Sequence, residues 1–149
     1  MREQYIHMGL LIYLGMLSYF DMKEKSIKAS YLIIGLMLAF LYRLGIILTG
    51  SEAYITGIYG ILPGVILLLI GRFTYQSIGY GDGLVIIIIG LLLSNIDMMY
   101  VIIYGFLASF IFCGAVVFCK KVSKETTIPF LPFLFLAHIL YFGRRLIGI

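Results

Sequence analysis

The chain has 149 residues, of which 62% are hydrophobic and only 12% are charged, and its mean hydropathy is +1.10. Soluble domains usually carry about 25% charged residues. This chain therefore has too few polar residues to cover the surface of a folded domain in water. The composition excludes an ordinary soluble domain and predicts a membrane protein in contact with lipid. The net charge of +4 does not indicate a nucleic-acid partner, because Lys and Arg in membrane proteins mainly set topology.

Six apolar segments follow one another along the chain, separated by charged and turn-forming clusters. They cover about residues 5–20, 29–48, 53–70, 83–93, 98–119 and 128–142. A transmembrane helix needs roughly 20 predominantly apolar residues, and none of the segments shows the period-two alternation of a barrel strand. We therefore expect an all-α membrane protein in which residues 1–149 form a single domain, a polytopic bundle of six transmembrane helices.

The distribution of basic residues predicts how this bundle is oriented. The loops after the first, third and fifth segments share one side of the membrane and carry seven of the 11 Lys and Arg residues. Because basic residues accumulate on the cytoplasmic side, we expect these loops to face the cytoplasm and both termini to lie outside a cell membrane. The seven residues are Lys23, Lys25, Lys28, Arg72, Lys120, Lys121 and Lys124.

Two aspartates fall on this predicted cytoplasmic side. Asp21 closes the first segment and Asp82 opens the fourth, whereas Asp97 lies at the opposite face. A helix reaching back from Asn95 to Asp82 is 13 residues long. Its length of roughly 20 Å is less than the hydrocarbon thickness of about 30 Å, so we expect Asp82 below the membrane surface. Two carboxylates in a partly desolvated cleft share a proton and supply the general base and general acid of a hydrolysis.

A purely structural role for both aspartates is the main alternative at this point. Asp21 would be an interfacial acid at a helix end, and Asp82 would be an N-cap favoured by the helix dipole. Gly79 and Gly81 count against this alternative, because two glycines just before an acid let the backbone approach a neighbour or an extended substrate at low steric cost. The pattern therefore favours an active-site loop that leads into Asp82.

Three motifs, in their order along the chain, resemble one known family. Gly79-Tyr80-Gly81-Asp82 matches the GxGD signature of the intramembrane aspartyl peptidases. The Asp21-Met22-Lys23 stretch and the Pro129-Phe130-Leu131-Pro132-Phe133 motif are similar to the first-aspartate and last-helix motifs of the type IV prepilin peptidases. The sequence departs from the family at Lys28, where proline is usual, and at Gly83-Leu84-Val85, where Val-Lys-Leu is common. The paired CxxC motifs of the long members are absent, so the resemblance is to the short, peptidase-only form.

This resemblance implies an aspartic-type endopeptidase that removes the short basic leader of a prepilin or pseudopilin at the cytoplasmic membrane face. Asp21 and Asp82 would be the catalytic pair, with no metal and no cofactor. Gly79 and Gly81 would shape the loop or bind substrate, and Pro129 and Pro132 would stiffen the start of the last helix. Pro129 is equally well explained as an ordinary first-turn helix proline.

Two other functions fit the same residues. A preflagellin-type peptidase would use nearly the same chemistry on a different substrate. A non-enzymatic membrane protein, such as a small transporter or an assembly scaffold, would use the carboxylates to bind protons. The latter fits less well, because Asp21 and Asp82 lie at one predicted face and no matching acid pair lies at the other.

Overall fold

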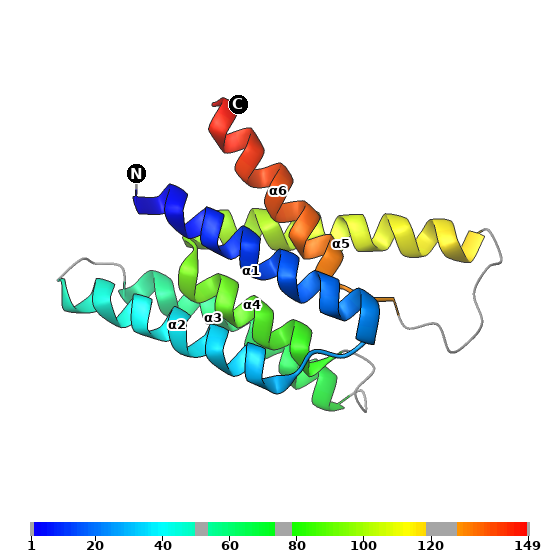
Figure 1. Ribbon diagram of the computed structural model, residues 1–149, viewed down its shortest axis with the longest axis horizontal. Coiled ribbons are helices and arrows are strands. Elements are labelled where there is room, and N and C mark those ends of the chain that lie inside the picture. The colour runs from blue at the N-terminus through cyan, green and yellow to red at the C-terminus, as the bar shows by residue number, and fades with distance from the viewer. Residues whose placement is uncertain (1, 50–53, 74–78, 119–127, 149) are drawn as a thin grey trace.

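The computed structural model of the protein describes residues 2–49, 54–73, 79–118 and 128–148, and within these ranges it contains six helices and no strand (Figure 1). The helices are α1 (Arg2–Glu24), α2 (Ala29–Leu48), α3 (Tyr54–Phe73), α4 (Tyr80–Leu92), α5 (Asn95–Phe118) and α6 (Leu131–Ile147). The prediction of an all-α fold with six helices is therefore confirmed. Some predictions fall outside the described residues: the orientation signal from Lys120, Lys121 and Lys124, and the polar stretch 74–78 before Gly79.

Of the predicted segments, only 29–48 coincides with its helix, and the largest differences concern α1, α4 and α6. α1 continues past residue 20 and ends only at Glu24, because charged residues are compatible with a helix that leaves the apolar region. Its end is marked by Lys25, which has a left-handed φ of 50° and whose N–H donates to the Asp21 carbonyl at 3.0 Å. Asp21 therefore lies within the last turn of α1 and does not follow the helix.

The GxGD motif is more helical than expected, whereas the proline motif is less helical than expected. α4 has Gly79 as its N-cap, and the Asp82 N–H donates to the Gly79 carbonyl at 3.1 Å. Gly81 thus belongs to the first helical turn, which corrects the expectation of a loop, and Asp82 is the third helical residue rather than the N-cap. In α6 the first-turn proline is Pro132, whereas Pro129 precedes the helix.

α4 lies at the centre of the bundle. It packs most extensively against α3 and also against α2, while α6 packs against both α1 and α5 (Figure 1). Most of α4 is buried, including Val85, Ile86 and Ile89. These side chains join Leu14 and Leu134 in the main apolar core. A short, almost wholly apolar helix is suited to this place, because every face of it contacts protein.

Glycines bring α3 and α4 into contact backbone to backbone. A Cβ added at Gly60 would lie 2.4 Å from the Gly90 carbonyl oxygen, and one added at Gly90 would lie 1.9 Å from the Gly60 carbonyl oxygen. One turn along, a Cβ at Gly64 would lie 2.8 Å from the Gly83 carbonyl oxygen. Small residues four apart on a helix permit this close packing of apolar helices. The α3–α4 pair therefore depends on these glycines remaining without side chains.

Two of the helices, α2 and α5, are long and apolar enough to cross a membrane. α4 and residues 59–73 of α3 are shorter apolar helices. The apolar windows of α2 and α5 are only 22% and 17% buried inside the protein, and large side chains such as Phe110 and Phe118 are exposed at 77% and 90%. Contiguous exposed apolar surface of this kind usually marks a membrane or protein interface, which supports membrane association.

The glycine contact makes a direct prediction about stability. Gly90→Ala should lower the free energy of unfolding by about 1–3 kcal/mol, because the new methyl group overlaps the α3 backbone and forces the helices apart. The measurement is denaturation of the purified protein in detergent, followed by circular dichroism.

The matched control is Gly114→Ala in α5, where an added Cβ meets nothing within 4 Å. Alanine is favoured over glycine inside a helix by roughly 0.5–1 kcal/mol, so this control should be neutral or slightly stabilising. Equal unfolding free energies for the two variants would contradict the close α3–α4 contact.

Candidate functional site

Asp21 is a buried acid held by the start of another helix. Its side chain projects from the last turn of α1 and the residue is only 9% exposed. Its Oδ2 atom accepts a hydrogen bond from the backbone N–H of Leu131, the first residue of α6, at 3.3 Å. Backbone N–H groups in the first turn of a helix have no partner inside the helix. The Asp21 carboxylate fills that need across the bundle and links the end of α1 to the start of α6.

Asp82 lies at the same end of the bundle. It is partly buried in the first turn of α4, a place where the helix dipole favours a negative charge. The two carboxylates lie close enough for the charge on Asp21 to act on Asp82. The structure therefore places Asp21 and Asp82 at the same end of the bundle and within electrostatic reach, although 61 positions separate them in the sequence.

Gly79 lies beside the Asp82 carboxylate, and Gly81 lies beside the linker between α1 and α2. A Cβ on Gly79 would lie 3.4 Å from Oδ2 of Asp82, and a Cβ on Gly81 would lie 3.3 Å from Cδ1 of Ile27 in the linker between α1 and α2. Gly79 has φ of −62°, which any residue adopts. Gly79 therefore needs no unusual backbone geometry, and a Cβ there would make an ordinary contact with the acid, whereas a Cβ on Gly81 would press on Ile27 of the linker.

The proline motif sits against α5 next to this acid pair. Phe130 packs on Phe106 with ring centroids 5.0 Å apart, and Phe133 packs on Phe112 at 5.3 Å. Pro132 is the second residue of α6, where the loss of an N–H costs no intrahelical bond. The motif therefore fixes the position of the α6 N-terminus, which in turn holds Asp21.

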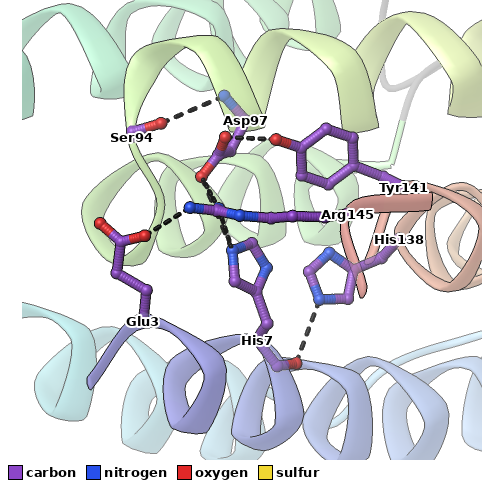
Figure 2. A network of polar contacts seen from close by, with 7 residues as sticks. All are labelled: Glu3, His7, Ser94, Asp97, His138, Tyr141 and Arg145. Carbon is purple, nitrogen blue, oxygen red and sulfur yellow. Dashed lines mark hydrogen bonds and ion pairs between the residues drawn. The ribbon is translucent and has the colours of Figure 1, made fainter. Parts of the chain in front are cut away.

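A second polar site lies at the opposite end of the bundle, and it was not predicted from the sequence. Seven residues from α1, α5, α6 and the turn before α5 meet there (Figure 2). We call them the Asp97 cluster: Glu3, His7, Ser94, Asp97, His138, Tyr141 and Arg145.

Asp97 is the centre of this cluster. Its own N–H donates to Oγ of Ser94 at 3.2 Å, so Ser94 caps the start of α5. Its carboxylate accepts hydrogen bonds from the Tyr141 hydroxyl and from Nη1 of Arg145, the latter at 2.8 Å. Arg145 also pairs with Glu3. An acid in the first turn of α1 and a base in the last turn of α6 are each favoured by the dipole of their own helix, so this pairing closes the α1–α6 contact.

The two histidines of the Asp97 cluster are almost completely buried. Their rings stack with centroids 5.3 Å apart, and His7 and His138 are 2% and 0% exposed. Nε2 of His138 lies 3.1 Å from the His7 carbonyl oxygen, to which it donates, and Nε2 of His7 lies 3.6 Å from Oδ2 of Asp97. Within the described part of the chain, Nδ1 of each ring is buried without a hydrogen-bond partner.

The sequence contained only one local signal for this cluster. Ser94 followed three residues later by Asp97 is a helix-start pattern, and it places Asp97 in the first turn of α5. The partnership of His7 with Arg145 spans 138 positions, and no spacing pattern reveals a contact of that range. A cavity of about 170 Å³ opens beside the cluster and is lined in part by Glu3, His7, Arg43 and Asp97.

Among the residues that the structure describes, no three His, Cys, Asp or Glu side chains are placed to hold a metal ion. The Asp97 cluster instead pairs its acids with Arg145 and Tyr141. Its geometry is that of a set of structural contacts that hold α1, α5 and α6 together.

If the cluster holds the three helices together, Asp97→Ala should lower the free energy of unfolding by about 1–3 kcal/mol, because the Tyr141 hydroxyl loses its acceptor in a partly buried place. Arg145 is 39% exposed and contributes less, since water replaces its partner. The measurement is the same detergent denaturation.

Glu24→Ala is the matched control. Glu24 is an exposed acid in the last turn of α1, and its removal should change the unfolding free energy by less than about 0.5 kcal/mol. A loss as large in Glu24→Ala as in Asp97→Ala would mean that the cluster has no special structural role.

No family model, curated protein or solved structure matches this chain. The likeness to the prepilin peptidases therefore rests on the three sequence motifs.

Proposed function

We propose that the protein is a membrane-embedded aspartyl endopeptidase that removes the short basic leader from a prepilin-like or pseudopilin substrate. The observation that carries the proposal is the pairing of two acids at one end of the bundle. Asp21 is 9% exposed, Asp82 is partly buried, and the charge on Asp21 acts on Asp82. Repelling carboxylates in a partly desolvated place share a proton, and one protonated and one ionised carboxyl group are what peptide hydrolysis by water requires.

The motif residues support this function because they surround the acid pair. Gly79 lies next to the Asp82 carboxylate, and the α6 N-terminus that follows Pro129 contacts Asp21. The basic linker residues Lys25 and Lys28, both exposed, lie at the same end of the bundle and follow Asp21 directly.

In the proposed membrane arrangement all six helices cross the bilayer, with the acid pair near the cytoplasmic surface and both termini outside. The lipid-facing surface would be the exposed apolar faces of α2 and α5. α4 has 13 residues and a length of roughly 20 Å, which is shorter than the hydrocarbon core of about 30 Å. Such a helix places Asp82 below the membrane surface, where an unpaired carboxylate is costly and a shared proton is favoured.

One observation favours the non-enzymatic alternative. The Asp97 cluster puts a second set of titratable side chains at the far end of α1, beside a cavity. A small transporter that binds protons would use acids at both ends of its helices. The acids of the Asp97 cluster are already paired with Arg145 and Tyr141. This pairing suits a structural contact between helices better than a transport site. Cleavage of a substrate by the purified protein separates the two functions.

The central test is leader cleavage by variants of the acid pair. Asp21→Asn and Asp82→Asn should each lower the cleavage rate by at least about 10²-fold, because an amide cannot exchange the shared proton. The assay uses the purified protein in liposomes and a prepilin-like peptide with a basic leader, and it follows product by mass spectrometry.

Asp97→Asn is the control for this assay. It replaces an acid at the other end of the bundle and keeps one oxygen that accepts a hydrogen bond, so cleavage should persist. Wild-type rates in either Asp21→Asn or Asp82→Asn would remove that residue from the mechanism. Loss of cleavage in Asp97→Asn alone would move the site to the Asp97 cluster.

A separate expectation concerns metals. Cleavage should continue after incubation with EDTA, because the proposed mechanism activates water with carboxyl groups alone. Activity that EDTA abolishes and added zinc restores would instead indicate hydrolysis by a metal-bound water.

A further inference from the structure

The first turn of α6 presents a single backbone donor to Asp21. Pro132 has no N–H, and the N–H groups of Phe133 and Leu134 both donate to the Phe130 carbonyl, at 3.0 and 3.4 Å. Of the first four residues of α6, only Leu131 has an N–H that points outside the helix, and it donates to Asp21. The proline motif thus selects one donor and directs it at one acid.

The aromatic contacts of the motif hold this donor in place. Phe130 and Phe133 flank Leu131 and pack on Phe106 and Phe112 of α5. Leu131 itself is 0% exposed. The donor therefore has little freedom to move away from the Asp21 carboxylate, and the positive end of the α6 dipole lies beside that carboxylate.

Asp82 has a different environment. It lies in the first turn of its own helix, and its carboxylate accepts no hydrogen bond from another described residue. Among the described residues, Asp21 on α1 is the charged group that acts on it from a neighbouring helix. A buried N–H donor stabilises a carboxylate more than it stabilises a carboxylic acid.

We propose that the Leu131 N–H makes Asp21 the ionised member of the pair and leaves the shared proton on Asp82. This inference rests on the proposed peptidase function and assigns the two catalytic roles within it. Leu131 is then a positioning residue that acts through its backbone, and Pro132 prevents the neighbouring position from offering a second donor.

The reaction then balances as follows. The oxygen of a water molecule bonds to the scissile carbonyl carbon, its proton passes to Asp21, and Asp82 gives its proton to the carbonyl oxygen. The product of this step is a neutral gem-diol. Asp21 next gives its proton to the amide nitrogen as the carbon–nitrogen bond breaks, and Asp82 takes back a proton from the gem-diol. An acid and an amine leave, and the starting protonation of both aspartates is restored.

The first experiment replaces Leu131 by its α-hydroxy analogue, which converts the backbone amide to an ester and removes the N–H while keeping the side chain. The acid limb of the pH–kcat profile should shift upward by about one pH unit, which is a tenfold loss of rate on that limb. The same replacement at Phe135, inside α6, breaks one helix hydrogen bond but not the Asp21 contact, and its profile should keep the wild-type position.

An unshifted profile in the Leu131 ester, or equal shifts in both esters, would overturn the assignment and leave the contact a structural one. The second experiment does not depend on activity. The infrared carbonyl band of the protonated carboxyl group in the wild-type protein should change frequency in Asp82→Glu and stay unchanged in Asp21→Glu.

These two results separate the assignment from the proposed function. A band that moves in Asp21→Glu instead, or no protonated band at all, would overturn the assignment whether or not the protein cleaves peptides. A wild-type protein that shows the expected band but leaves every prepilin-like peptide intact would overturn the peptidase function alone.

Discussion

The backbone contact between α3 and α4 is the constraint on which the rest of the bundle depends. Gly60 and Gly90 place the two helices so close that neither can carry a side chain at the crossing. α4 is therefore fixed along its length, with Asp82 at its start and the turn that leads to Asp97 just after its end. Because α4 is short and surrounded, both polar ends of the protein are set by its position.

The two ends then differ in how their charges are satisfied. Around Asp97, acids meet Arg145, Tyr141 and Ser94 in nearly complete pairing, which makes a fastening between helices far apart in the sequence. Asp21 and Asp82 lie at one end of the bundle, where the charge on Asp21 acts on Asp82, and among the described residues the Leu131 N–H is the donor to Asp21. A cluster whose acids are paired resists a change of protonation, whereas an underpaired acid pair exchanges protons readily. The arrangement around Asp21 and Asp82 is therefore the one that fits the proposed acid–base role.

α1 and α6 connect these two ends. At one end Arg145 and His138 of α6 contact Glu3 and the His7 carbonyl of α1. At the other end the start of α6 meets Asp21. The register between the two helices is thus fixed twice, and a shift of one along the other would break contacts at both ends. The Asp97 cluster therefore supports the geometry of the acid pair without touching it.

The sequence by itself determined the helical class, the number of helices and the ends at which the main acids lie. Long apolar runs separated by charged clusters allow few other folds, and the order of the segments places Asp21 and Asp82 at one end and Asp97 at the other. Helix boundaries were harder to predict from the sequence. A helix that leaves the apolar region continues through charged residues until a local signal ends it, such as the left-handed conformation of Lys25.

Only the tertiary structure decided which helices are neighbours and which polar atoms meet. The contact between Leu131 and Asp21 joins residues 110 positions apart, and the one between Arg145 and His7 joins residues 138 apart. Apolar helices of similar composition pack in many orders, and the order here depends on where glycines permit close approach. Periodicity and composition describe one helix at a time, so the partners of the buried polar groups follow only from the packed bundle.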